Sequence, residues 1–406
     1  MKRLVAHIIY YNKTVLLCCL LSIVCCLLSG CHDRLVLPEE PIQPRAERER
    51  TVIVYMAADN SLNSVVRNDT TEMIAAKDLV PDDVNFIIYL DDRLHKPAIY
   101  ELSAKSGLKL WKQADQELCS TDPKTMLQTL KDIEHYFPAR HYGLTLWSHA
   151  TGWTPRRKTF GEDLNRGTST AESEMEIPEL HSVLAQLPKF DYLFFDACFM
   201  QCIEVAYELR DVADFIIGSP AEIPGPGAPY DKILAALASA NAQEIVQGYD
   251  SAYPGTYDRV EYSGVLLSLI DCAKLEPLAQ ATGQLLLPFY MDKSEPMAEG
   301  FQRYCDLDWT SKSYLFDMRT TMHQLLSPED YEAWLALYQE AVPLATYSST
   351  LTWFARFCEN PRLLNPECYG GVSMFVPMEK YQSYGLNTQF QQTAWYGATG
   401  FSATGW

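Results

Sequence analysis

The stretch that decides the fold is YGLTLWSH, residues 142–149, taken together with YLFFDAC, residues 192–198. Each is a short run of apolar, β-branched and aromatic residues, and the first ends at His149 and the second at Cys198. Such runs are typical of strands, and their nearly continuous hydrophobicity indicates burial on both faces of a sheet. The question is whether the two residues are packed side chains or one reactive pair.

Similar runs recur on both sides of these two strands. Strands alternating with longer amphipathic segments predict an α/β fold, with a mostly parallel sheet and helices on both faces. We expect further strands at 51–58, 85–92 and 214–220, a hairpin of 98–103 and 108–112, and helices at 61–79, 123–137, 178–187, 199–211 and 230–239.

The pattern changes after about residue 240. Helical segments at 242–252, 273–290 and 328–345 dominate, and a strand at 264–271 interrupts them. This predicts a mainly helical C-terminal elaboration, either as a second subdomain or as an extension of the same sheet.

The N-terminus has the layout of an export signal. Lys2 and Arg3 precede an apolar segment at 15–28, and the sequence Leu-Ser-Gly-Cys follows and ends at Cys31. These four residues resemble the lipobox of bacterial lipoproteins, so we expect cleavage before Cys31 and acylation of this cysteine. The alternative is an uncleaved membrane anchor, for which the apolar segment is short. Both interpretations predict an exported protein tethered to a bacterial membrane, at the outer membrane or cell surface.

A charged, proline-containing segment follows the signal. It lacks apolar periodicity and is typical of a solvated spacer. We therefore divide the chain into a signal peptide at 1–30, a flexible tether at 31–50, an α/β domain at 51–240, and an elaboration of the same unit at 241–406.

Charge and cysteine usage exclude several functions. The chain has 52 acidic and 33 Lys or Arg residues, which argues against a nucleic-acid partner because phosphate binding needs clustered cations. Five of the 12 cysteines lie at or before residue 31. The other seven show no Cys-x-x-Cys spacing, so neither a zinc knuckle nor a thioredoxin-type pair is indicated. An odd number in an exported protein leaves at least one thiol free.

The positions of His149 and Cys198 favour chemistry over packing. Functional groups collect at the carboxyl ends of strands in an open parallel sheet. We expect Cys198 to begin the helix at 199–211, whose N-terminus would stabilise a thiolate, while a nearby imidazole transfers the proton. The alternative is an inert core cysteine and a hydrogen-bonded histidine. Placement of both residues at the ends of neighbouring strands favours the pair.

The order of these motifs resembles a known family. An apolar strand ending in Ser-His, followed by one ending in Asp-Ala-Cys, is similar to the caspase-like cysteine peptidases. LTLWSHATGW and DACFMQCIEVAYEL resemble the clostripain family in particular, as do VIVYMAADNSLN, SGVLLSLIDCAKL and GGVSMFVP. The likeness runs from about residue 51 to the C-terminus. It implies a caspase-like fold and an endopeptidase that cuts protein or peptide substrates after Arg or Lys, with no required cofactor.

The resemblance also implies roles for single residues. Cys198 matches the nucleophile and His149 the proton carrier, and the N–H groups of Ala150 and Cys198 would form the oxyanion hole. The family has Gly where this chain has Ala150, which would be strained if the position requires a positive φ. Asp196 matches the acid that binds the basic substrate side chain, with Glu222 as a second candidate. The alternative for Asp196 is a structural salt bridge or a capped loop.

Two further family properties suggest candidate residues. Precursors are commonly cut between the histidine and cysteine strands, and the polar 151–176 loop offers Arg156, Arg157, Lys158 and Arg166. The alternative is an ordinary charged surface loop. Calcium activation is known in the family, so the resemblance implies Ca²⁺ as a candidate activator of this protein. The acidic pairs Asp91-Asp92 and Glu162-Asp163 lack EF-hand spacing.

Other interpretations are kept open. Cys202 would share a helix face with Cys198, where it is either redox-active or a core thiol. Asp59-Asn60 is expected to cap the first helix at the edge of the site. Ala150 leaves room for a catalytically weak or inactive lipoprotein that uses the scaffold as a peptide-binding module. A phosphoryl-accepting domain using Asp91 lacks a Gly-rich phosphate loop.

Overall fold

The computed structural model describes residues 43–153, 159–164, 174–253, 264–291, 301–304, 314–347 and 366–404. The chain from Pro44 onward forms one compact unit. The predicted signal peptide, Cys31 and most of the predicted tether lie outside the described residues.

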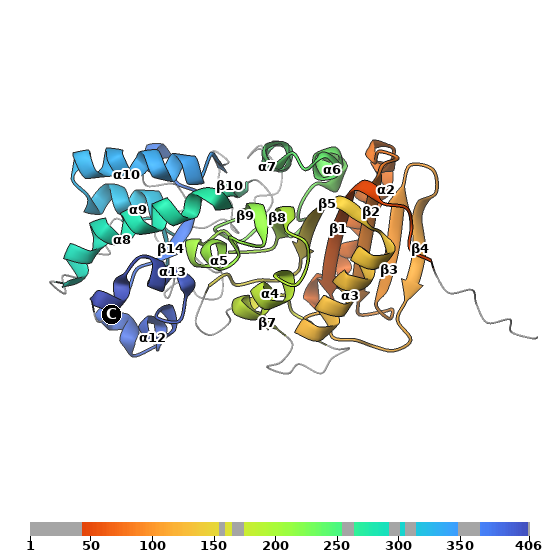
Figure 1. Ribbon diagram of the computed structural model, residues 1–406, viewed down its shortest axis with the longest axis horizontal. Coiled ribbons are helices and arrows are strands. Elements are labelled where there is room, and N and C mark those ends of the chain that lie inside the picture. The colour runs from red at the N-terminus through yellow and green to blue at the C-terminus, as the bar shows by residue number, and fades with distance from the viewer. Residues whose placement is uncertain are drawn as a thin grey trace, which may run out of the picture. The chain divides into compact units, whose positions relative to one another are not determined.

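A central sheet organises this unit, and its strand order is β13-β10-β9-β8-β5-β1-β2-β3-β4 (Figure 1). The parallel strands are β1, Arg48–Ala58; β2, Val84–Asp92; β5, Ala139–Trp147; β8, Phe190–Asp196; and β9, Ala213–Gly218. Antiparallel strands extend both edges: β3, Ala98–Ser103; β4, Gly107–Gln113; β10, Leu266–Asp271; and β13, Leu344–Tyr347. The predicted mostly parallel α/β fold is confirmed.

Because β10 pairs with β9, the strand predicted at 264–271 extends the main sheet. Smaller sheets accompany it. One contains β11, Arg303–Tyr304; β12, Leu315–Asp317; and β14, Ser373–Phe375, and another pairs β6, Thr159–Phe160, with β7, Met175–Glu176.

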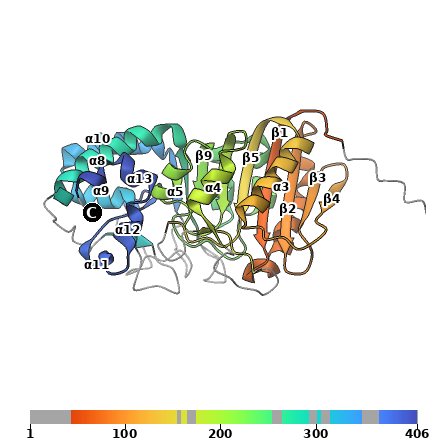
Figure 2. The same cartoon turned by 60° about the horizontal axis from the view of Figure 1, so that its bottom comes forward.

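Helices cover both faces of the sheet (Figure 1), and Figure 2 looks onto one of these faces. One face carries α3, Pro123–Tyr136; α4, Ile177–Leu184; and α5, Ile203–Glu208, and the other carries α2, Val66–Ala75; α6, Tyr230–Ser239; and α7, Ala242–Ser251. The C-terminal part contains α8, Leu275–Met291; α9, Met318–Leu325; α10, Pro328–Ala341; α11, Glu379–Gln382; α12, Leu386–Phe390; and α13, Ala394–Ala398. The predicted helical C-terminal elaboration is present.

The two faces have separate hydrophobic cores. Alternate side chains of a strand point to opposite faces, so Ile53 and Tyr55 of β1 join one core, while Val52 and Val54 join the other. All four are buried. Burial on both faces explains why the central strands have nearly continuous apolar sequences.

The predicted boundary between tether and folded chain is wrong. The Arg45 N–H donates to the Tyr136 carbonyl at 3.1 Å, and the Arg45 guanidinium pairs with Glu101 and lies 4.8 Å from the Phe137 ring centre. β1 begins at Arg48, before the predicted start at residue 51. The aliphatic part of an arginine side chain can cover apolar surface while its guanidinium forms an ion pair. The charged segment around Arg45 therefore packs against the fold.

Helix boundaries also differ from expectation. The segment predicted as one helix at 61–79 forms a 3₁₀ helix η1, Ser61–Ser64, then α2, then a second 3₁₀ helix η2, Lys77–Leu79. Asn60 caps η1 by accepting the Leu62 N–H at 2.8 Å, as a short polar side chain commonly does at this position. This places Ser61 directly beyond the end of β1.

Candidate active site

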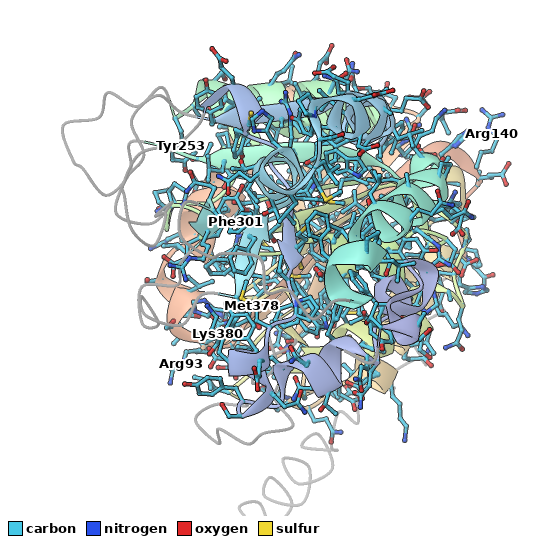
Figure 3. The ribbon with its side chains drawn as sticks, turned by 90° about the vertical axis from the view of Figure 1, so that its left-hand side faces the viewer. Arg93, Arg140, Tyr253, Phe301, Met378 and Lys380 are labelled. Carbon is cyan, nitrogen blue, oxygen red and sulfur yellow. The ribbon has the colours of Figure 1, made fainter. Side chains whose placement is uncertain are left out.

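The carboxyl ends of the parallel strands lie together at one end of the sheet. Trp147 of β5 pairs in register with Met56 of β1 and with Asp196 of β8. Figure 3 shows Arg93, which follows β2, and Arg140, near the start of β5, at opposite sides of the molecule. Arg93 marks the carboxyl end of the parallel strands and Arg140 marks their amino end. His149 and Cys198 each follow the paired residues Trp147 and Asp196 by two positions. The register therefore brings the two predicted site residues to the same place.

The loops after these strands pack directly against each other. Gly152 has φ +61°, and a Cβ placed on it would lie 2.1 Å from the Phe199 carbonyl oxygen. One residue later, the Trp153 N–H donates to Cys202 Sγ at 3.2 Å. The loop after His149 therefore contacts the loop after Cys198, and only glycine fits at position 152.

The expectation that Cys198 begins a helix is wrong. α5 begins at Ile203, and Phe199 has a left-handed φ of 60°. The Phe199 and Gln201 N–H groups donate to Ala221 and Ser219, both at 3.0 Å, and so pair with the segment that leaves β9. These contacts override local helix propensity, because the N–H groups already have partners outside a helix. The helix N-terminus that was expected to stabilise a Cys198 thiolate is therefore absent from this position.

Another backbone group contacts the Cys198 thiol. The Ile223 N–H donates to Cys198 Sγ at 3.4 Å. Cys198 is half-buried, whereas Cys202 is fully buried. Burial raises the pKa of the Cys202 thiol well above its ordinary value, so Cys202 is a core thiol. It does not share a helix face with Cys198, because the helix starts after both cysteines.

His149 is held by a residue that the sequence did not single out. Ser61 Oγ lies 2.7 Å from His149 Nε2. The Gly161 N–H donates to the His149 carbonyl at 2.8 Å. The side chain and the backbone of the histidine are thus fixed from two separate segments.

Ala150 carries no backbone strain. The positive-φ non-glycine residues of the described chain are Phe199 and Ala240, and the left-handed conformation in this loop falls on Gly152 instead. Ala150 forms an antiparallel bridge with Phe160, and the bond from the Gly161 N–H to the His149 carbonyl flanks that bridge. In such a pair the two bridged residues direct their own N–H groups away from each other. The Ala150 N–H therefore points away from Phe160.

Asp196 is enclosed by the chain itself. Its side chain is 2% exposed, and its oxygens accept the Ala228 N–H at 3.1 Å and the hydroxyls of Tyr230 and Tyr249 at 3.1 and 3.5 Å. These partners come from α6, α7 and the segment before α6. Burial raises its pKa to about 7, although the Ala228 N–H and the tyrosine hydroxyls oppose the shift.

Further carboxyl groups surround Asp196. Asp69 of α2 is fully buried, and burial, together with the charges of Asp196 and Glu72, raises its pKa to about 9. Glu72 accepts the Tyr230 N–H at 2.9 Å. Glu222 is half-buried and adjoins Ile223, the donor to Cys198. The two predicted acids therefore differ in burial, Asp196 being buried and Glu222 half-buried.

A second acidic group lies at the ends of β1 and β2. Asp91 is fully buried, and its pKa is raised to about 9 by burial and by the neighbouring carboxyl of Asp163. Asp163 accepts the N–H and hydroxyl of Ser120 at 2.5 and 2.8 Å. Asp92 faces the following loop and accepts two of its N–H groups. Within the described ranges, no cluster of three or more His, Cys, Asp or Glu residues is arranged to hold a metal ion. Asp91 is also inaccessible to a phosphoryl donor.

The four proposed processing residues, Arg156, Arg157, Lys158 and Arg166, lie outside the described residues. Residues 159–164, between Lys158 and Arg166, are described and are held to the rest of the fold by hydrogen bonds and packing. Phe160 is fully buried, the Leu164 N–H donates to the Asp59 carbonyl at 2.7 Å, and Asn60 Nδ2 donates to the Glu162 carbonyl at 2.8 Å. The 159–164 segment therefore lies against the loops that follow β1 and β5.

Comparisons with known proteins agree with this geometry. Residues 54–402 match the model of the clostripain family. Clostripain from Hathewaya histolytica is 26% identical over 219 residues, which cover 45% of this chain and 41% of that protein. The matched part is thus less than half the length of this relative.

Solved structures extend the likeness over most of the chain. A secreted C11 cysteine protease from Bacteroides thetaiotaomicron, in complex with an irreversible peptide inhibitor, is 28% identical with a TM-score of 0.74, and an inactive zymogen C11 protease from Parabacteroides distasonis is 26% identical with a TM-score of 0.71. Each comparison covers 87% of this chain and 99% of the other. With the family match spanning most of the sequence and the histidine and cysteine at adjacent strand ends, the chain belongs to the clostripain family of cysteine peptidases.

Proposed function

We propose that the protein is an exported cysteine endopeptidase that cleaves after Arg or Lys, with Cys198 as nucleophile and His149 as proton carrier. The observation that supports this most strongly is the register of β5 and β8, which brings both residues to the carboxyl ends of two adjacent strands. A cysteine thiol and a histidine imidazole that follow adjacent strands are the residue types of a nucleophile and its base.

The proposed reaction has two stages. Cys198 thiolate attacks the carbonyl carbon of the peptide bond, and the Ala150 and Cys198 N–H groups stabilise the oxyanion. The intermediate collapses, the carbon–nitrogen bond breaks, and the leaving amine takes a proton from protonated His149. Water then attacks the thioester, His149 accepts a proton from it, and the acid product and Cys198 are released.

Specificity for a basic side chain rests on the acids beside Cys198. Glu222 is half-buried and adjoins Ile223, so we place it as the first contact for an arriving Arg or Lys. Asp196 lies two residues before the nucleophile. We propose that its negative charge attracts the basic substrate side chain from within the fold. Its hydroxyl partners, Tyr230 and Tyr249, are neutral, and a guanidinium would favour the ionised carboxyl.

Self-activation is proposed at Arg156, Arg157, Lys158 or Arg166, because these residues match the proposed specificity and a related protein is an inactive zymogen. The anchored 159–164 segment would keep the chain together after a cut on either side. Attachment to a membrane through acylated Cys31 is supported by the Leu-Ser-Gly-Cys sequence, and export is supported by a secreted relative. No helix in the described part of the chain has the length and apolar character needed to span a membrane.

The test is release of a fluorescent leaving group from peptides ending in Arg, Lys, Asp or Leu by the full chain purified in detergent, with and without calcium. Turnover of the Arg and Lys peptides, lost in Cys198→Ala, is expected. Absence of turnover on every peptide, also after trypsin nicking of the 151–176 loop, would favour the peptide-binding module. The structure weakens that alternative, because Ala150 adopts no strained φ.

A further inference from the structure

We infer that Ser61 is a third member of the site, a positioning residue that holds His149 by its Nε2 atom. Ser61 Oγ lies 2.7 Å from Nε2, which is the length of a well-formed hydrogen bond. With Nε2 engaged by Ser61, the ring presents Nδ1 as the atom that exchanges a proton with Cys198. This inference rests on the proposed function and gives a role to a residue to which neither the sequence analysis nor the comparisons assigned one.

Ser61 is itself fixed by a buried amide. Asn60 is fully buried and lies directly before Ser61 at the start of η1. Its Nδ2 donates to the Ala57 carbonyl at 2.9 Å, to Ser148 Oγ at 3.3 Å and to the Glu162 carbonyl at 2.8 Å. One side chain thus ties together the end of β1, the residue before His149 and the 159–164 segment. Positioning of this kind limits the motion of the histidine ring relative to the sheet.

Helix capping does not account for the Ser61 hydroxyl. The N-terminus of η1 is capped by Asn60 Oδ1, which accepts the Leu62 N–H at 2.8 Å. Packing does not account for it either, because Ser61 is exposed. The contact with His149 is the hydrogen bond that the structure gives this hydroxyl.

A serine hydroxyl suits a histidine that changes its protonation state. Because Nδ1 must take the proton, the neutral ring carries its own proton on Nε2, and the hydroxyl accepts from Nε2–H both in this state and when the ring is an imidazolium. The bond therefore persists through both proton transfers of the proposed reaction. Being neutral, the hydroxyl orients the ring without adding a charge to it.

The variants Ser61→Ala and Ser61→Thr test this role. Ser61→Ala is expected to lower kcat on an Arg peptide about tenfold while KM changes less than about twofold, since general acid–base catalysis contributes about 10²- to 10⁴-fold and only its orientation is impaired. Ser61→Thr, which keeps the hydroxyl, is expected to restore most of kcat. The matched control is Ser64→Ala, because Ser64 is an exposed serine at the other end of the same 3₁₀ helix.

A second readout does not require peptidase activity. The rate at which iodoacetamide alkylates Cys198, followed by mass spectrometry with Cys119 as internal reference, reports on the thiolate directly. Ser61→Ala is expected to narrow the pH range over which Cys198 reacts, because an imidazolium without its acceptor is less stable beside the thiolate. Thermal unfolding of each variant checks that the fold is retained.

The outcomes separate the two proposals. Unchanged kcat and an unchanged alkylation profile in Ser61→Ala, a Thr variant no better than Ala, or an equal loss in Ser64→Ala would each overturn the role of Ser61. Absence of peptide turnover in the unaltered protein, with an alkylation profile that still depends on Ser61, would overturn the peptidase function and leave the positioning role intact.

Discussion

Trp147 of β5 and Asp196 of β8 are partners in the register of the parallel sheet. His149 and Cys198 follow them by two residues each, so the pairing of two strands sets the position of the proposed catalytic pair. The loops then close on each other at Gly152 and Phe199. Because the sheet itself determines this relationship, the site is expected to tolerate changes in surface loops better than changes at these contacts.

Gly152→Ala is expected to impair both folding and activity. Its φ of +61° costs a non-glycine residue about 1–3 kcal/mol, and its Cβ would lie 2.1 Å from the Phe199 carbonyl oxygen. The measurement is urea unfolding together with peptide turnover. The matched control is Gly225→Ala, because a Cβ at Gly225 meets nothing within 4 Å. Equal stability and activity of the two variants would contradict the close approach of the loops.

Recognition of arginine is expected to depend on the ionisation of Asp196. Its pKa is raised to about 7, so the carboxyl is mostly neutral at pH 6 and mostly charged at pH 8. We expect the ratio of kcat/KM for an Arg peptide to that for its neutral citrulline analogue to rise about tenfold over this range. The ratio cancels the titration of Cys198 and His149. In Asp196→Asn the rise should disappear, whereas an equal rise in that variant would exclude Asp196 from recognition.

The free energy of unfolding is expected to fall as pH rises from about 5 to 8.5. Asp91 and Asp69 have pKa values raised to about 9 in the fold, whereas an unfolded chain ionises them near pH 4. Between these values the folded state holds more protons, so its stability decreases with rising pH. Asp91→Asn should flatten this slope, and Asp82→Asn, at an exposed turn, should not. Equal slopes in the two variants would refute the assignment.

Self-processing is expected to depend on Cys198. Purified protein should be cut between residues 151 and 176, and Cys198→Ala should stay intact. Replacement of Arg156, Arg157 and Lys158 by Gln, with Arg166 retained, should move the cut to Arg166 or abolish it. Electrophoresis and N-terminal sequencing measure this. Nicking of purified Cys198→Ala would show that another protease makes the cut.

The sequence predicted the main strands well because their apolar runs are long and buried on both faces. The same runs brought His149 and Cys198 to one edge, and so the candidate pair followed from strand pattern alone. Register on a parallel sheet is strongly specified by which face each side chain must bury.

Contacts between distant segments explain what the sequence did not predict. The start of α5 at Ile203 depends on the Ala221 and Ser219 carbonyls, which come from the end of β9. Enclosure of Asp196 depends on Tyr230 and Tyr249, which belong to α6 and α7. Local propensity contains no information about such partners, so the helix was placed too early and the depth of the acid was missed.

Ser61 was missed for the same reason. It is separated from His149 by 88 positions, and its neighbours Asp59 and Asn60 carry the stronger capping signal. The polar pair Asp59-Asn60 after the first strand indicated that this segment lies near the site. It did not indicate that Ser61 contacts His149.

The most direct measurement is labelling of the protein with an irreversible electrophile carried on a peptide that ends in Arg, followed by peptide mass spectrometry. We predict one adduct, on Cys198, that is prevented by excess Arg peptide and strongly reduced in His149→Ala. Labelling of Cys119 or another cysteine instead, or equal labelling of Cys198 by a peptide ending in Asp, would contradict a Cys198–His149 peptidase site that recognises a basic side chain.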